Sequence, residues 1–300
     1  MKVSFSAPGR AGIIGNPSDM YGGCVISCST PVRNTCTIEE SSEWELPEDT
    51  RLWDAATSRL PVEGKYKVTW ETDVPRSSGL SGSTALLAAT VACIMTVRGE
   101  QMPEDRREFA ELVRDIELRE AGIVCGYQDA YMCVLGGMNK MDFSGKHPIS
   151  SGRLGTVTSM ELPGNFLLVT TGVERLSGSV HGPIRDRWLS GDILAIQLIE
   201  ELTELAKKTT TNSTVKDLAD FMNRNFQIIQ ELGGSGDDID RLVQDCQNNG
   251  AGAAKLAGAG MGGTVIALCD NPSELQQRLT KIGYTKFLRP VPVNGLTREV

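Results

Sequence analysis

The chain has 300 residues, of which 40% are hydrophobic and 23% are charged, an ordinary balance for a globular protein with a sizeable core. Its formal net charge of -8 argues against non-specific binding to nucleic acid or to an anionic membrane, because both carry negative charge. An anionic small-molecule substrate is compatible with this charge if its site is locally basic.

The cysteine content and the N-terminal segment indicate the cellular compartment of the protein. The 8 cysteines form no C-x-x-C pair and there are only 2 histidines, so we expect free thiols rather than a zinc cluster. Residues 1–10 lack the apolar stretch of a secretory signal, and the apolar stretch at 85–97 is too short to span a bilayer. We therefore expect a cytoplasmic protein.

The first half of the chain predicts strands, loops and three helices. Strands are expected at 3–6, 24–38 and 66–71 from alternation and β-branched residues. Glycine and proline predict loops and turns at 8–23, and a loop at 73–83. A short helix is expected around Trp53, a helix buried on all sides at 84–97, and an amphipathic helix between Pro103 and Gly122.

The second half predicts mostly helices. A strand pair is expected within 157–171, around Pro163 and Gly164, and helices are expected at 184–208, 214–233, 237–248 and 272–282. Strands are expected at 264–269 and 286–293. Because strands and helices mix in both halves, we expect an α+β fold of two domains, residues 1–155 and 156–300.

A serine- and glycine-rich segment leads directly into the apolar helix. Small residues let a backbone approach a phosphate, hydroxyls add donors, and a helix N-terminus offers free N–H groups. The Walker pattern G-x-x-x-x-G-K-[ST] is absent, and a plain turn that caps a buried helix is the alternative. The candidate nucleotide-binding residues are Pro75, Ser77, Ser78, Gly79, Leu80, Ser81, Gly82, Ser83 and Thr84.

A second glycine-rich segment lies near the end of the chain. Gly258, Gly260 and Gly263 formally match the dinucleotide pattern G-x-G-x-x-G. That pattern requires a preceding strand and a following helix, whereas here a strand is expected to follow. A nicotinamide-dependent oxidoreductase is therefore disfavoured, and we expect a glycine hinge where backbone meets a ligand or another loop.

A third segment, near the start of the chain, reads Ala-Pro-Gly-Arg at 7–10 and Gly-Asn-Pro-Ser-Asp at 15–19, and ends in Gly-Gly at 22–23. A lone arginine or aspartate in a turn is usually solvated or capping. The three segments together, in this order and at this spacing, resemble the galactokinase–homoserine kinase–mevalonate kinase–phosphomevalonate kinase (GHMP) superfamily over nearly the whole chain.

This resemblance implies a small-molecule kinase that uses MgATP. It also implies an N-terminal domain like ribosomal protein S5 domain 2 and a ferredoxin-like C-terminal domain, with the site in the cleft between them. Asp129, before Gly136 and Gly137, matches the family's catalytic aspartate, which accepts or orients the hydroxyl proton. Arg10 matches a basic residue beside that base and the transferred phosphate. A helix-capping or surface aspartate is the alternative at 129.

The resemblance further implies a magnesium site. Ser83 matches the hydroxyl ligand of the phosphate loop, and Glu117, twelve positions before Asp129, matches the glutamate ligand. Oxygen ligands of this kind suit Mg²⁺, together with phosphate oxygens and water. The alternative for Glu117 is an exposed charge on a helix.

The substrate residues follow the same resemblance. Asp19 matches an aspartate that binds sugar hydroxyls in galactokinases, but Asn16 and Pro17 replace their Glu-His, which weakens a galactose assignment. The patterns Gly-Asn-Pro-Ser-Asp at 15–19, Gly-Leu-Ser-Gly-Ser at 79–83 and Gly-Tyr-Gln-Asp at 126–129 look most like glucuronokinases, which phosphorylate a sugar acid at its anomeric hydroxyl. A carboxylate would then have to be recognised by Arg185 or Arg187, unless both are a solvated helix face. Tyr21, Gly22 and Gly260 complete the expected substrate site.

Other acceptors remain open at this stage. A heptose phosphate, a polyol, homoserine or mevalonate would use the same chemistry. A catalytically inactive ligand sensor is disfavoured, because it would have no chemical reason to retain Asp129, Glu117, Ser83 and Arg10. The sequence predicts no oligomeric state.

Overall fold

The computed structural model describes residues 1–75, 77–148, 152–172, 178–258 and 263–300. One antiparallel sheet has the strand order β10-β1-β2-β4-β5, with β3 paired to β2. A second antiparallel sheet has the order β7-β8-β6-β9. The first sheet consists of β1 (Lys2–Ile14), β2 (Cys24–Glu40), β3 (Tyr66–Thr72), β4 (Met138–Asp142), β5 (Thr156–Ser159) and β10 (Thr297–Arg298).

The two longest strands run beyond their predicted ends. The expected loop at 8–23 is wrong for residues 8–14, because β1 continues through Pro8 and Gly9 as far as Ile14. The pairing of β1 with β2 shifts register between Pro8 and Arg10 and again between Gly12 and Ile14. Such bulges let a strand accommodate glycine and proline and redirect its side chains. A short 3₁₀ helix, η1 (Ser18–Tyr21), then connects to β2.

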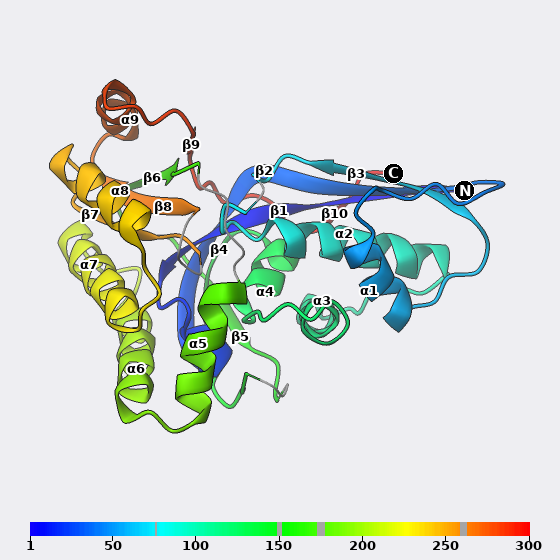
Figure 1. The fold of residues 1–300 in the computed structure, drawn as a ribbon, viewed down its shortest axis with the longest axis horizontal. Coiled ribbons are helices and arrows are strands. Elements are labelled where there is room, and N and C mark those ends of the chain that lie inside the picture. Colours follow the sequence, from blue (N-terminus) through cyan, green and yellow to red (C-terminus); the bar gives the residue numbers. More distant parts are fainter. Residues whose placement is uncertain (76, 149–151, 173–177, 259–262) are drawn as a thin grey trace.

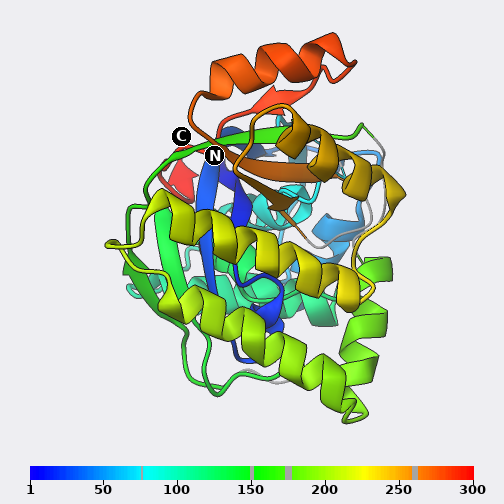
Figure 2. The same ribbon diagram turned by 90° about the vertical axis from the view of Figure 1, so that its left-hand side faces the viewer.

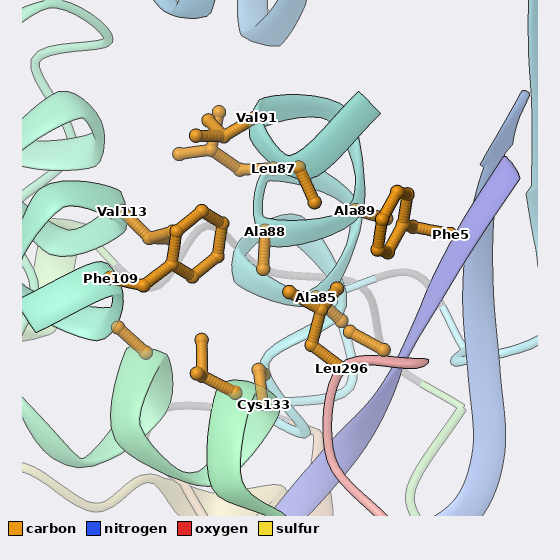
Figure 3. Packing of buried hydrophobic residues seen from close by; sticks show 14 of the residues in the cluster. Phe5, Ala85, Leu87, Ala88, Ala89, Val91, Phe109, Val113, Cys133 and Leu296 are labelled. Atoms are coloured by element: carbon orange, nitrogen blue, oxygen red, sulfur yellow. The ribbon is translucent and has the colours of Figure 1, made fainter. Parts of the chain in front are cut away.

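Four helices lie on one side of the first sheet (Figure 1). Helix α2 (Gly82–Val97) packs against β1 and β2 and is buried along most of its length, as its uniformly apolar sequence predicts. Figure 3 shows Phe5 of β1 and Phe109 of α3 packed against the alanines of α2, where small side chains allow close approach. The other three helices are α1 (Arg51–Arg59), α3 (Arg106–Arg119) and α4 (Gln128–Leu135).

Helices α7 (Val215–Glu231), α8 (Asp237–Asn248) and α9 (Pro272–Lys281) pack against the second sheet (Figures 1 and 2). The strands of this sheet are β6 (Asn165–Thr170), β7 (Ala253–Leu256), β8 (Thr264–Cys269) and β9 (Phe287–Leu288). The predicted strand at 286–293 is confined to the two residues of β9. The predicted strand pair within 157–171 is wrong, since β5 pairs with β4 in the first sheet and β6 pairs with β8 in the second.

The predicted helix at 184–208 is two helices. Helix α5 (Gly178–Leu189) ends before Gly191, whose φ of 80° lies in the left-handed region that favours glycine. Asp192 then caps α6 (Ile193–Lys208) by accepting a hydrogen bond from the backbone N–H of Ala195. No helix in the described part of the chain is both long and apolar enough to cross a membrane.

The two sheets share a hydrophobic cluster. It joins Ile13 of β1 and Ile26 of β2 to Leu202 of α6 and Ile266 of β8. The loop before α2 contributes Leu80 to the same cluster, so the serine- and glycine-rich segment lies where the two sheets meet. The division at residue 155 stays a prediction; β5 and β10, which lie beyond it, belong to the first sheet.

Candidate active site

The loop before α2 contains several polar groups that are free to bind a ligand. Ser77 and Ser81 adopt left-handed backbone conformations, with φ of 52° and 62°, although neither is glycine. A left-handed conformation at a residue other than glycine costs of order 1–3 kcal/mol of folding free energy, and such residues cluster at functional sites. The hydroxyls of Ser78 and Ser81 are buried without a hydrogen-bond partner among the described residues. The loop therefore offers free donors beside the N-terminus of a buried helix, which is what an oligophosphate requires.

The late glycine-rich segment packs directly on this loop. A Cβ at Gly258 would lie 2.3 Å from the carbonyl oxygen of Gly79, and a Cβ at Gly263 would lie 2.4 Å from that of Ser78. The expectation that backbone meets another loop here is confirmed for these two glycines, while Gly260 lies outside the described residues. Strand β8 follows the segment, so the dinucleotide interpretation fails on context.

Replacing Gly263 by alanine is expected to lower the free energy of unfolding by about 2–5 kcal/mol. The new Cβ would meet rigid backbone, and φ at this residue is 96°, so overpacking and left-handed strain add. The matched control is Gly99→Ala, because φ there is 74° but nothing lies within 4 Å of a Cβ. Urea unfolding of both variants checks this; equal losses would contradict the packing argument.

Arg10 connects the three segments. Its Nε and Nη2 donate to Oδ1 of Asp129 over 2.8 and 2.6 Å. Its Nη1 donates to the carbonyl oxygens of Gly79, over 2.5 Å, and Ala257, over 3.3 Å. The arginine side chain is 4% exposed and that of Asp129 is 22% exposed, so the carboxylate faces the site while the cation supports it from behind. The expected pairing of Arg10 with Asp129 is therefore present.

Glu117 of α3 points its carboxylate at the start of α2, where a magnesium ligand was expected. Its Oε1 accepts hydrogen bonds from Ser83 Oγ over 3.1 Å and from Thr84 Oγ1 over 2.9 Å, and its Oε2 accepts from Thr84 Oγ1 over 2.8 Å. Burial, with the negative charge of Asp129 nearby, raises the pKa of Glu117 to about 7. The side chain is buried, which rules out the alternative of an exposed helical charge.

This donor set suits a magnesium ion bound together with phosphate oxygens. The described residues hold no group of three or more His, Cys, Asp or Glu that could enclose a metal. Mg²⁺ usually keeps several waters and takes one or two protein oxygens plus substrate phosphates. Glu117 and the hydroxyl of Ser83, beside the unpartnered hydroxyl of Ser81, fit that pattern.

Asp19 holds the N-terminus of α4 in place. Its Oδ2 accepts hydrogen bonds from the backbone N–H groups of Tyr127 and Gln128, over 2.7 and 3.0 Å. A Cβ at Gly126 would lie 2.0 Å from that oxygen, so only glycine leaves room for the carboxylate. Burial raises the pKa of Asp19 to about 6. The position predicted to bind sugar thus also orients the helix that carries Asp129.

Replacing Asp19 by asparagine is expected to remove a pH dependence of stability. Between pH about 4 and about 6 the folded protein retains a proton on Asp19 that the unfolded chain releases, so the free energy of unfolding falls as pH rises, by up to about 3 kcal/mol. Asparagine can still cap α4 through its amide oxygen. Urea unfolding of both proteins across this range measures the difference, and parallel stability curves would contradict it.

A small polar pocket lies between these groups. It is lined by Arg10, Asp19 and Asp129, together with Pro17, Met20, Gly126, Gln128 and Gly258. Among the other predicted substrate residues, Tyr21 packs on Trp188 of α5 with ring centroids 5.3 Å apart. Its hydroxyl is buried without a partner among the described residues. Gly22 ends η1, where a Cβ would meet the carbonyl oxygen of Lys146 at 2.8 Å.

The structure separates the two candidate arginines. Arg187 donates to Asp192 over 2.7 Å and to the carbonyl oxygen of Leu232 over 3.3 Å, so it joins the start of α6 to the end of α7. Among the residues that the structure describes, Arg185 makes only long contacts, 3.3 and 3.4 Å, with the adjacent Asp186. Because Trp188 of α5 packs on Tyr21, the helix that carries Arg185 lies beside η1.

Two residues of the site were not predicted. Lys255 of β7 is fully buried, and its Nζ donates to Asn16 Oδ1 over 2.7 Å and to the carbonyl oxygens of Leu256 and Gly12. Burial holds the pKa of this lysine well below its usual value. A lysine between small apolar residues was the available signal. Gln128 lines the pocket beside Asp129, and no sequence pattern singled it out.

Comparison with family models gives two matches. The model for the GHMP kinases N terminal domain matches residues 50–137, and the model for the GHMP kinases C terminal domain matches residues 198–285. These two matches confirm the expected fold class, an α+β fold with N- and C-terminal GHMP kinase domains.

Individual relatives agree with the family models. Glucuronokinase 1 of Arabidopsis thaliana is 30% identical over 95% of this chain and 90% of its own length. A mevalonate kinase of Methanothermobacter thermautotrophicus is 24% identical over 90% of this chain and 91% of its own. The crystal structure of Lactococcus lactis galactokinase complexed with galactose superposes with a TM-score of 0.81 at 18% identity, over 99% of this chain and 95% of that one.

Proposed function

The chain belongs to the GHMP kinase family and is an ATP-dependent phosphotransferase, and on this premise we propose that it phosphorylates a sugar hydroxyl, the anomeric hydroxyl of a sugar acid. One observation carries the assignment of the site. A single guanidinium, that of Arg10, bonds both to Asp129 and to the phosphate loop at Gly79. Base and phosphate loop are thereby fixed relative to one another, as in-line transfer requires.

Each residue has a defined role in the transfer. The loop hydroxyls of Ser78 and Ser81, with the N-terminus of α2, bind phosphate oxygens of ATP. Asp129 accepts the proton of the acceptor hydroxyl as the bond to phosphorus forms, and Arg10 stabilises negative charge on the transferring group. Mg²⁺ held by Ser83 and Glu117 would neutralise charge on the phosphates.

The nature of the acceptor is supported by relatives and by one arginine. Glucuronokinase 1, by its name, acts on a sugar acid. A substrate carboxylate needs a cation that the fold does not already use, and Arg185 meets this requirement better than Arg187. Asp19 supplies an acceptor for sugar hydroxyls at the floor of the pocket.

Replacing Arg185 by glutamine is expected to raise KM for the sugar acid by about 10–100-fold and KM for the matching neutral sugar by less than about 3-fold. The difference arises because a charge-assisted hydrogen bond to the carboxylate is lost. Arg187→Gln is the matched control and should mainly lower stability. Steady-state kinetics with both sugars checks this; equal increases in KM would remove Arg185 from the substrate site.

The proposed function is tested by ADP release from ATP. The purified protein is assayed with a panel of neutral sugars, sugar acids, heptose phosphates, homoserine and mevalonate. We expect turnover that depends on a sugar or sugar acid. Turnover with homoserine or mevalonate alone would overturn the sugar assignment. Nucleotide binding without turnover of any acceptor would favour an inactive sensor instead.

A further inference from the structure

The side chain of Gln128 is held on two sides within the pocket. Ser27 Oγ, from near the start of β2, donates a hydrogen bond to Gln128 Oε1 over 2.9 Å. On the other side, Gln128 Nε2 faces Asp19 Oδ1 at 3.5 Å. Gln128 is 5% exposed and Ser27 is fully buried, so neither contact competes with bulk water. The amide therefore has a fixed position next to Asp129.

The chemistry of the neighbours also fixes which end of the amide faces the pocket. An ionised carboxylate can only accept hydrogen bonds, so the atom facing Asp19 has to be the nitrogen. The hydroxyl of Ser27 donates to the amide oxygen from the opposite side. Gln128 Nε2 and Asp19 Oδ1 each retain the capacity for a further hydrogen bond. The contact of 3.5 Å is at the limit of a hydrogen bond, the NH₂ group has two donors, and the strong bonds to Asp19 go to Oδ2.

We propose that Gln128 Nε2 and Asp19 Oδ1 form a donor–acceptor pair that reads two neighbouring hydroxyls of the sugar, which makes Gln128 a specificity-determining residue. One hydroxyl donates to Asp19 while the oxygen of its neighbour accepts from Gln128. This inference rests on the proposed function, because a vicinal diol is characteristic of a sugar. An acceptor with a single hydroxyl would leave one member of the pair buried and unpaired, at a cost in affinity.

The experiment uses monodeoxy analogues of the sugar that the wild-type protein phosphorylates. Removing the hydroxyl that Gln128 reads should lower the wild-type kcat/KM by about 10-fold or more. In Gln128→Met, a side chain of similar length without polar donors, kcat/KM for the parent sugar should fall by a similar factor. Loss of that one hydroxyl should then cost nothing further. The exposed Gln277→Met of α9 is the matched control and should keep the wild-type pattern.

Ser27→Ala is a second, independent test of the role of Gln128, and it decides whether the inference holds if Gln128→Met does not fold. Without the serine hydroxyl the amide is free to rotate, so discrimination should weaken at the same ring position. Affinity for MgADP within about 3-fold of wild type shows that the phosphate loop is intact.

Two outcomes would overturn the inference and are distinguishable. If wild type turns over sugars and both variants keep the wild-type discrimination at every ring position, Gln128 only connects β2 to η1 and the inference alone fails. If wild type turns over none of the sugars, the proposed function fails and the inference with it.

Discussion

Replacing Asp129 by asparagine is expected to lower kcat at least about 100-fold. Asparagine has nearly the same shape, and its amide oxygen can accept the two hydrogen bonds that Arg10 now gives to Oδ1. The substitution therefore preserves the local structure but removes the group that accepts the hydroxyl proton. Since Asp129 makes no direct hydrogen bond to the described residues of the phosphate loop, nucleotide affinity should change by less than about 3-fold.

Steady-state kinetics with the responding sugar, together with MgADP titration, measures both quantities. The exposed Asp270→Asn, at the end of β8, is the matched control and should retain wild-type kcat. If Asp129→Asn keeps more than about a tenth of the wild-type kcat, the carboxylate is not the base, and its bond to Arg10 is structural.

Replacing Glu117 by glutamine is expected to raise the Mg²⁺ concentration needed for half-maximal activity by about 10–100-fold, because a neutral amide oxygen is a weaker ligand for a hard cation than a carboxylate. The fold should tolerate the change, since glutamine can still accept from Ser83 and Thr84. Removing a buried charge also relieves a desolvation cost, so the melting temperature in metal-free buffer should not fall.

The measurement is a titration of Mg²⁺ at fixed ATP, with activity as the signal. Glu108→Gln on the exposed face of the same helix, α3, is the matched control. An unchanged Mg²⁺ requirement in Glu117→Gln would remove this residue from the proposed metal site and leave it as a buried anchor for Thr84.

Local patterns predicted the elements whose signal is strong and continuous. The apolar run before Val97 gave a buried helix, observed as α2, and the strand at 264–269 was observed with the same bounds. Several short elements were missed, among them α4 and β7. Helix α4 has eight residues and owes its start to Asp19, which lies over a hundred residues earlier in the chain. Strand β7 consists of two alanines, a lysine and a leucine, and alanine and lysine carry little β preference of their own.

In β1, pairing with a neighbouring strand overrides the local turn preference of the sequence. Pro8 and Gly9 read as a turn, yet pairing with β2 extends the strand through them with a bulge. A Cβ at Gly9 would lie 2.7 Å from the carbonyl oxygen of Leu80, so the glycine allows the phosphate loop to approach the strand. The same bulge precedes Arg10, which reaches Asp129. The residues that look like a turn in the sequence thus serve to build the site.

The candidate site residues differ in the same way. Asp129, Arg10, Ser83 and Glu117 were predicted from motifs, and the structure pairs Arg10 with Asp129 and Ser83 with Glu117. Motifs did not lead us to predict Gln128 and Lys255 as site residues, because their roles depend on contacts with β1, β2 and η1 that only the fold brings about. Arg185 and Arg187 looked equivalent at helical spacing, and their different partners separate them.

The most direct test of phosphate transfer to a sugar is ³¹P NMR of the complete reaction with ATP, Mg²⁺ and the responding sugar. The account predicts one sugar phosphate, formed in equal amount with ADP and split by coupling to the anomeric proton. Inorganic phosphate as the sole product beside ADP would mean that water is the acceptor, and it would contradict the assignment of this pocket to a sugar.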